Sequence, residues 1–203
     1  MANAYDTSEG NISVSVGALW HQSNFASSAS GARSSPYGSF GFTVLGDVNK
    51  TGSLEVGYYF LNKQYYREYG GLSLVEQTKL SHITMGYRRW LNSRTSASLT
   101  LGTGYSMGEV QVVHSDFLPA DLMETSARDT TEYSVDLAVQ YEVWRHNENS
   151  IFLETRYSKS ITAREGERAD HGTVMLSWQV LLQDKDPRDN TNSEENESEF
   201  DEK

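Results

Sequence analysis

The sequence predicts an all-β protein: an eight-stranded antiparallel up-and-down barrel that crosses a membrane. Eight stretches alternate apolar and polar residues with a period of two, the links between them alternate between short and long, and their polar faces carry charge. No run of 18 apolar residues occurs, so a transmembrane helix is not expected. The expected strands are 11–22, 37–45, 53–64, 79–91, 96–107, 130–144, 150–161 and 171–182.

The first four expected strands each have one apolar face. Its residues are Ile12, Val14, Val16, Ala18 and Trp20 in the first; Phe40, Phe42 and Val44 in the second; Leu54, Val56, Tyr58 and Phe60 in the third; Ile83, Met85 and Tyr87 in the fourth. Ser, Thr and Gly dominate the opposite faces, and Leu19 is the one break in the alternation of the first strand. This pattern is typical of a strand with one apolar face and one polar face.

The last four expected strands continue the pattern. Their apolar residues are Ala97, Leu99, Leu101 and Tyr105; Tyr133, Val135, Leu137, Val139, Tyr141 and Val143; Ile151, Leu153 and Tyr157; and Val174, Leu176, Trp178, Val180 and Leu182. An even number of strands suits a closed antiparallel meander.

The links differ in length on the two sides of the barrel. Residues 46–52, 92–95 and 145–149 are short polar turns, whereas the other four links, 23–36, 65–78, 109–129 and 162–170, are longer. Short turns at one rim and long loops at the other are typical of bacterial outer-membrane barrels.

The charged face is expected to line the lumen. It carries Glu55, Arg88, Glu132, Asp136, Glu142, Glu154 and Arg156. An eight-stranded lumen is too narrow for a channel, and these groups can fill it as a salt-bridge network. A soluble barrel would line the same space with apolar side chains.

Aromatic residues fall mostly toward strand ends, as expected at the two membrane interfaces. They are Trp20, Tyr58, Phe60, Tyr87, Trp90, Tyr105, Tyr133, Tyr141, Trp144, Tyr157 and Trp178.

Residues 11–182 resemble, in this layout, the small outer-membrane barrels typified by OmpX and the transmembrane domain of OmpA. The charged lumen and the closing strand from Gly172 carry the resemblance. It implies a bacterial outer-membrane location with the short turns in the periplasm, contact with outer-membrane lipid and lipopolysaccharide, and insertion by the barrel-assembly machinery.

Both ends of the chain differ from the barrel at 11–183. Residues 1–10 form a polar lead-in without the basic and apolar segments of a signal peptide, so we expect the mature form. Residues 184–203 hold nine acidic and three basic side chains and are expected to be a disordered periplasmic tail. This negative tail argues against nucleic acid as a partner.

No motif indicates a cofactor or a metal. The segment from Asp47 begins like a calcium loop but has Tyr58 where a bidentate Glu is required, and the five histidines lack metal-binding spacing.

A lipid A-modifying acyltransferase or deacylase would need a catalytic group near the outer rim. The candidates there are His21, His114, Ser115, Asp116 and His171, which have no further motif to align them.

The third long link holds the most distinctive loop sequence. Residues 110–113 continue the strand-like alternation, and exposed apolar groups are expected at Phe117, Leu118, Leu122 and Met123. Such groups mark either a partner contact or a cap made by the loops. We therefore predict a non-enzymatic outer-membrane barrel with a structural role, or one that binds a periplasmic or outer-membrane protein partner through its outer loops or its tail. The alternatives are the lipid A enzyme and a soluble lipocalin-like carrier.

Overall fold

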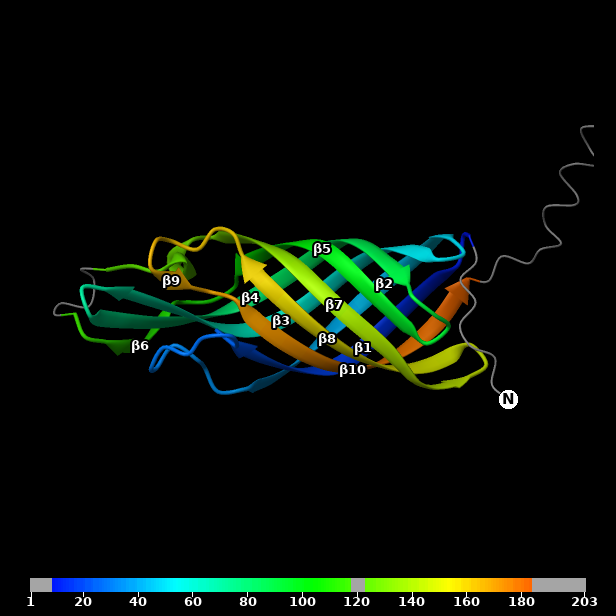
Figure 1. Ribbon diagram of the computed structural model, residues 1–203, viewed down its shortest axis with the longest axis horizontal. Coiled ribbons are helices and arrows are strands. Elements are labelled where there is room, and N and C mark those ends of the chain that lie inside the picture. The colour runs from blue at the N-terminus through cyan, green and yellow to red at the C-terminus, as the bar shows by residue number, and fades with distance from the viewer. Residues whose placement is uncertain (1–8, 118–122, 184–203) are drawn as a thin grey trace, which may run out of the picture.

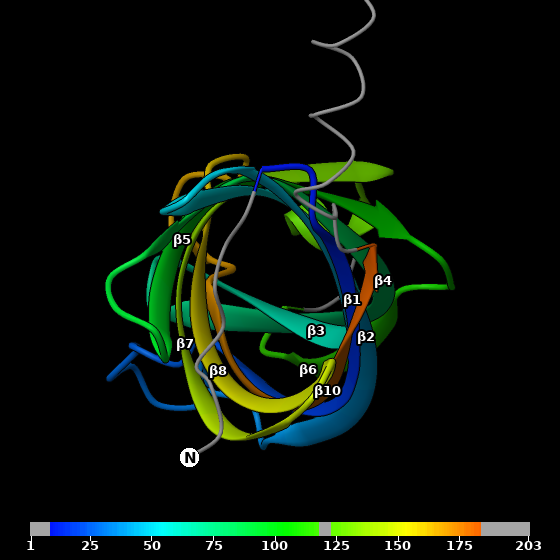
Figure 2. The same cartoon turned by 90° about the vertical axis from the view of Figure 1, so that its right-hand side faces the viewer.

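The computed structural model describes residues 9–117 and 123–183, which form one closed antiparallel barrel (Figure 1). Its eight strands are β1 (Ile12–Ser23), β2 (Tyr37–Asn49), β3 (Gly52–Tyr69), β4 (Leu72–Trp90), β5 (Thr95–Ser106), β7 (Thr131–His146), β8 (Asn149–Ser160) and β10 (His171–Gln183). Each pairs with its neighbours, and β1 pairs with β10 to close the ring seen end-on in Figure 2. The predicted eight-stranded barrel is confirmed. The predicted acidic tail lies outside the described residues.

Two short strands and a helical turn lie beyond the barrel at the long-loop end. They are β6 (Gln111–Ser115), β9 (Glu167–Arg168) and the 3-10 helix η2 (Ser126–Arg128). β6 pairs with β4 and β9 pairs with β3. We call this end the crown: residues 23–36, 64–78, 107–117, 123–130 and 161–170. The start of β1 and the end of β10 lie at the opposite, short-turn end.

The prediction of a loop at 65–78 was wrong. β3 and β4 stay paired along this segment as far as Tyr69 and Leu72, and a tight turn at Gly70 and Gly71 joins them. Both glycines have positive φ, 60° and 81°, which a two-residue hairpin turn requires. Beyond the membrane neither face of a strand must be apolar, so the alternation that marks a membrane strand weakens there.

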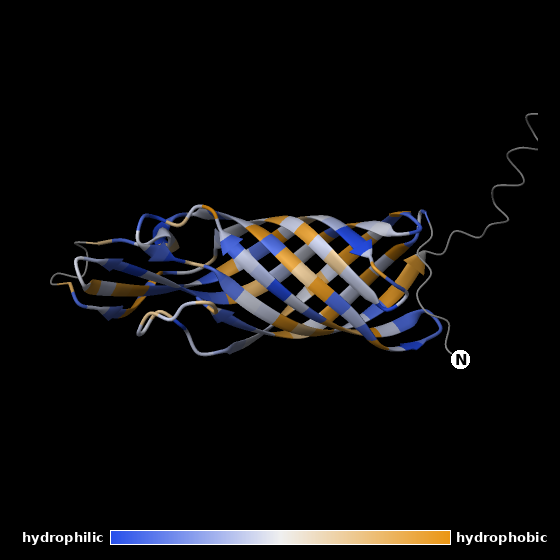
Figure 3. Ribbon diagram, viewed as in Figure 1, coloured by the Kyte–Doolittle hydropathy of each residue, from blue (hydrophilic) through white to orange (hydrophobic). Residues whose placement is uncertain are grey.

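Apolar residues recur along the barrel strands (Figure 3), and those that are exposed form a belt around the outside of the barrel. Leu137 is 58% exposed, Leu101 68% and Leu176 47%, although all three lie in the middle of their strands. A continuous band of this kind is stable only against lipid. No helix among the described residues is long and apolar enough to cross a membrane.

The prediction that Trp90 is an interfacial aromatic residue was wrong. It is buried in the lumen against Leu45 and Phe152 at the short-turn end, and its indole N–H donates to Ser53 Oγ at 3.2 Å. Other predicted interfacial aromatics are exposed on the outer surface, among them Trp20, Tyr105, Tyr133, Tyr141, Trp144 and Trp178.

Small residues make room in the lumen for large ones. The Tyr59 ring lies so close to Gly41 and Gly57 that a Cβ on either glycine would come within 2.7 Å of it. Leu19, Leu61, Leu80 and Met175 pack with Tyr59, so the lumen also contains an apolar cluster that the sequence prediction did not include. Leu19, the break in the first strand, points inward here.

Candidate functional site

Two glutamates and two arginines bridge the lumen from wall to wall. Arg88 Nε donates to Glu55 at 2.7 Å and its Nη2 to Glu154 at 2.5 Å, while Arg156 Nη2 donates to Glu55 at 2.5 Å and to Glu154 at 3.0 Å. Glu55 is on β3 and Arg156 on β8, with three strands between them in either direction around the barrel. This pair therefore joins opposite walls.

Asp136 lies next to this cluster on the crown side. His82 Nε2 is 2.9 Å from Asp136 Oδ2, and the hydroxyls of Ser134 and Ser158 donate to Oδ1 at 2.7 and 2.5 Å. Arg156 Nη1 is 3.9 Å away and connects Asp136 to the cluster.

Lys63 and Glu132 make a third link across the lumen. Lys63 Nζ donates to Glu132 at 2.5 Å, and the Tyr65 hydroxyl donates to the other carboxylate oxygen at 2.7 Å. Sequence reasoning placed Glu132 in the lumen but missed Lys63. The signal was present, because Glu55, Tyr59 and Lys63 share the inward register of β3.

Glu142, also predicted for the network, lies apart from it. Its carboxylate accepts from Arg145, three residues along β7 toward the short-turn end. The other six predicted lumen residues are at most 5% exposed and occur in the three groups above. Buried charges of this number are tolerated only when paired. Their contacts cross the lumen at successive levels, which leaves a filled interior in place of a pore.

Two glutamates, the buried Glu76 and the half-buried Glu167, hold the crown over the mouth of the barrel. Glu76 accepts from the backbone N–H and hydroxyl of Thr125 and from Arg128, and Glu167 accepts from the backbone N–H and hydroxyl of Ser126. Burial raises the pKa of Glu167 above its ordinary value. These contacts hold η2 against β3 and β4.

The predicted loop contacts are only partly accessible. Met123 is buried and Phe117 is half-buried, so the expectation of free apolar groups at these two positions was wrong. Just after Met123, the buried Ala127 packs with Tyr65 and Ala169 at the barrel mouth. Leu118 and Leu122 lie outside the described residues.

The candidate catalytic groups are not assembled. His21 and His171 are buried inside the lumen and not at the outer rim, and His21 Nε2 accepts from the backbone N–H of Asn62. His114 contacts Asp116 at 3.1 Å, whereas Ser115 Oγ interacts with the backbone of Phe117. No hydrogen bond between Ser115 and a histidine is present in residues 9–117 and 123–183.

β6 is the terminal strand of the sheet and lies outside the apolar belt. One edge pairs with β4, and no strand of the described chain pairs with the other. Val112 and Val113 are 47% and 53% exposed. An exposed edge with apolar side chains is a template for a further strand.

Comparison with solved structures identifies the fold. Ail, the attachment invasion locus protein of Yersinia pestis, in complex with the heparin analogue sucrose octasulfate, is similar with a TM-score of 0.51 and 16% identity, over 86% of this chain and 100% of Ail. The outer-membrane protein OprG of Pseudomonas aeruginosa is similar with a TM-score of 0.59 and 7% identity, over 88% of this chain and 99% of OprG. The chain has the fold of the eight-stranded outer-membrane β-barrels. No protein-family model and no curated protein sequence matches it.

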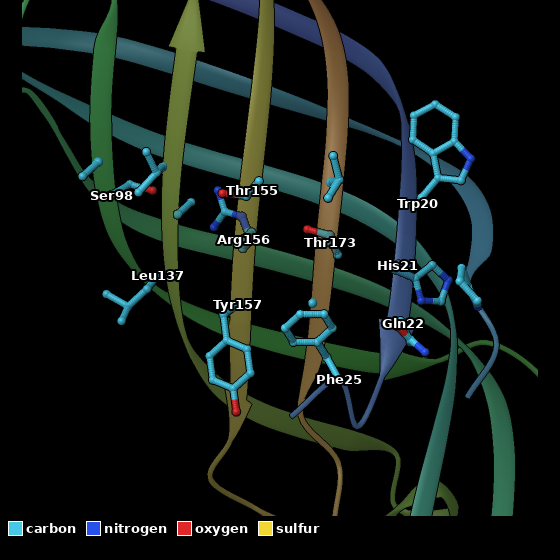
Figure 4. Close-up of a pocket in the computed structure, with 16 residues that line it drawn as sticks. Trp20, His21, Gln22, Phe25, Ser98, Leu137, Thr155, Arg156, Tyr157 and Thr173 are labelled. Atoms are coloured by element: carbon cyan, nitrogen blue, oxygen red, sulfur yellow. The ribbon is translucent and has the colours of Figure 1, made fainter. Parts of the chain in front are cut away.

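The outer wall of this outer-membrane barrel contains an apolar groove of about 630 Å³ (Figure 4). Trp20, Leu137, Tyr157 and Val174 line it, and Phe25 from the first loop lies beside Tyr157. The inward-facing Arg156 and His21 also border it. Ligand sites in proteins have a similar volume, about 300–1,000 Å³.

Proposed function

We propose that the protein is a non-enzymatic surface protein of the outer membrane, which binds an extended polypeptide segment of a partner along the free edge of β6. The exposed edge carries the proposal, because no strand of the described residues pairs with it and two valines of β6 are exposed outside the membrane. The ion-paired lumen argues against a role as a pore, and the separated histidines and Ser115 argue against catalysis.

The charge of the crown bears on the kind of partner. Ail has been solved with a sulfated sugar, which a basic surface would favour. In the described crown of this barrel acidic side chains outnumber basic ones. A polypeptide partner fits this surface better than a polyanion does.

Photo-crosslinking on intact cells tests the proposal. A photoreactive phenylalanine analogue at Val113 should give a discrete adduct, because Val113 is an exposed residue of the strand that we propose to bind the partner. The same analogue at Leu72, which is 44% exposed at the hairpin tip but away from that edge, is the matched control.

The adduct should disappear when Val112→Lys is added, since a lysine on an edge strand opposes further pairing. Equal adducts at positions 113 and 72, or an adduct that survives Val112→Lys, would contradict the proposal. So would the absence of any adduct at position 113.

A further inference from the structure

The groove in the barrel wall follows a single cross-strand row that begins at Trp20 and continues through four shorter side chains. Trp20 pairs with Val174, Val174 with Thr155, Thr155 with Val139 and Val139 with Ala97, across β1, β10, β8, β7 and β5. All five point away from the lumen. At about 4.8 Å per strand, the row spans roughly 19 Å.

Longer side chains border this row on both sides. The next row toward the crown holds Tyr157, Leu137 and Leu99, and the next row toward the short turns holds Leu176, Leu153 and Tyr141. Tyr157 and Leu137 of the crown-side row line the groove and form its ridge. We call this groove the trough, and the register of five strands fixes its course.

The trough runs diagonally across the membrane region. Trp20 lies three residues from the crown end of β1, whereas Ala97 lies two residues from the short-turn end of β5. Its span is comparable to one leaflet of hydrocarbon, about 15 Å as half of a core of about 30 Å.

Phe25, a residue of the first loop, lies at the crown end of the trough. Asn24 has a positive φ of 54°, and its buried side chain donates to the Ala32 carbonyl at 2.8 Å. This turn sends Phe25 onto the lipid-facing surface, where its ring packs over Gly172. Tyr157 donates to Asp170 at 3.1 Å beside it, so the trough has a polar boundary at this end.

We infer that the trough between Trp20 and Ala97 binds one acyl chain of lipopolysaccharide. The trough is continuous with the lipid-facing belt, so hydrocarbon is what covers it. Its polar boundary is at the crown end, which faces the outer leaflet when the short turns face the periplasm. A chain seated there exchanges mobile lipid contacts for fixed ones with the floor and with the crown-side ridge of Tyr157 and Leu137.

The test uses purified lipid A as the probe. Wild-type protein is placed in nanodiscs of dimyristoylphosphatidylcholine doped with lipid A, released into mild detergent and examined by native mass spectrometry. We expect one lipid A to remain bound. Thr155→Phe, which fills the floor, should reduce the retained lipid A at least about tenfold, equivalent to about 1.4 kcal/mol.

Thr103→Phe is the matched control, because Thr103 is a lipid-facing threonine on β5 that does not line the groove. It should retain lipid A like the wild type. Folding of each variant is judged by the change in its gel migration before and after boiling. If Thr155→Phe does not fold, Val139→Phe, which fills the same floor, replaces it in the test.

Four outcomes would overturn the inference: no retained lipid, retention of the phospholipid in place of lipid A, equal retention in Thr155→Phe or Val139→Phe and the wild type, or a protein dimer that the groove variants abolish. The last would assign the trough to a second copy of the chain.

Discussion

Arg156 contacts three carboxylates in the lumen, those of Glu55, Glu154 and Asp136, and lies over the Tyr59 ring. Its removal leaves buried negative charge without its partner. We expect Arg156→Met to lower the free energy of unfolding by about 3–5 kcal/mol, the range for a broken buried ion pair. Urea unfolding in lipid vesicles measures this loss.

Leu137→Arg provides the comparison on the opposite face. Leu137 points to lipid, where an arginine costs about 2–4 kcal/mol near mid-membrane. Unchanged unfolding in both variants would show that the two faces of the barrel are assigned wrongly.

Asp116 attaches β6 to the hairpin in a pH-dependent way. Hydrogen bonds from the Ser73 hydroxyl and backbone N–H, assisted by His114, lower the pKa of this exposed carboxylate from its usual 3.8. A lowered pKa means that the contact contributes fully above pH 3.8 and is lost as the pH falls through the lower folded value.

Amide exchange at Ser73 is the measurement for this contact. Exchange should accelerate in the wild type as the carboxylate is protonated, whereas Asp116→Asn should show no transition in that window. A wild-type profile that matches Asp116→Asn would contradict the assignment.

The inward or outward direction of most strand residues was predictable from register alone. Glu55, Arg88 and Arg156 share the lumen because each lies in phase with the polar face of its own strand. The partners of these residues were not predictable, since they depend on how strands far apart in sequence are offset. Lys63 was missed and Trp90 was assigned to the wrong face. Both lie near the end of an expected strand, where the alternation that gives the inward direction of the earlier residues also applies to them.

The hairpin of β3 and β4 is an element that stands outside the membrane, and its turn depends on two glycines. Gly71 has φ of 81°, so Gly71→Val should strain the turn by about 1–2 kcal/mol. We expect faster hydrogen exchange near the tip, at 65–76, with exchange in the membrane part of β3 unchanged.

Gly71→Asn is the control, since asparagine tolerates this conformation better than valine. If both variants exchanged like the wild type, the two-glycine turn would not be what holds the hairpin.

Elements in the crown were harder to predict than elements in the membrane. Alternation in 110–113 indicated a strand, and β6 begins at Gln111, but its pairing with β4 depends on a hairpin that the sequence pattern presented as a loop. A strand in the membrane must have one apolar face because that face contacts lipid. The parts of β3 and β4 outside the membrane contact water, so neither of their faces needs to be apolar.

On the scale of the whole molecule, the barrel separates an ion-paired interior from an exposed crown. Glu55–Arg156 and Lys63–Glu132 each cross the lumen, and η2 packs against its mouth. Because the interior is occupied by these contacts, the partner contact and the lipid contact that we propose both lie on the outer surface.

Single-channel recording in planar lipid bilayers tests that central claim most directly. The refolded wild-type protein, compared with a porin inserted in the same way, should show no unitary conductance at neutral pH, because paired side chains fill the lumen at several levels. A steady, reproducible conductance step from the wild-type barrel would show that the lumen is an open path and would contradict the account.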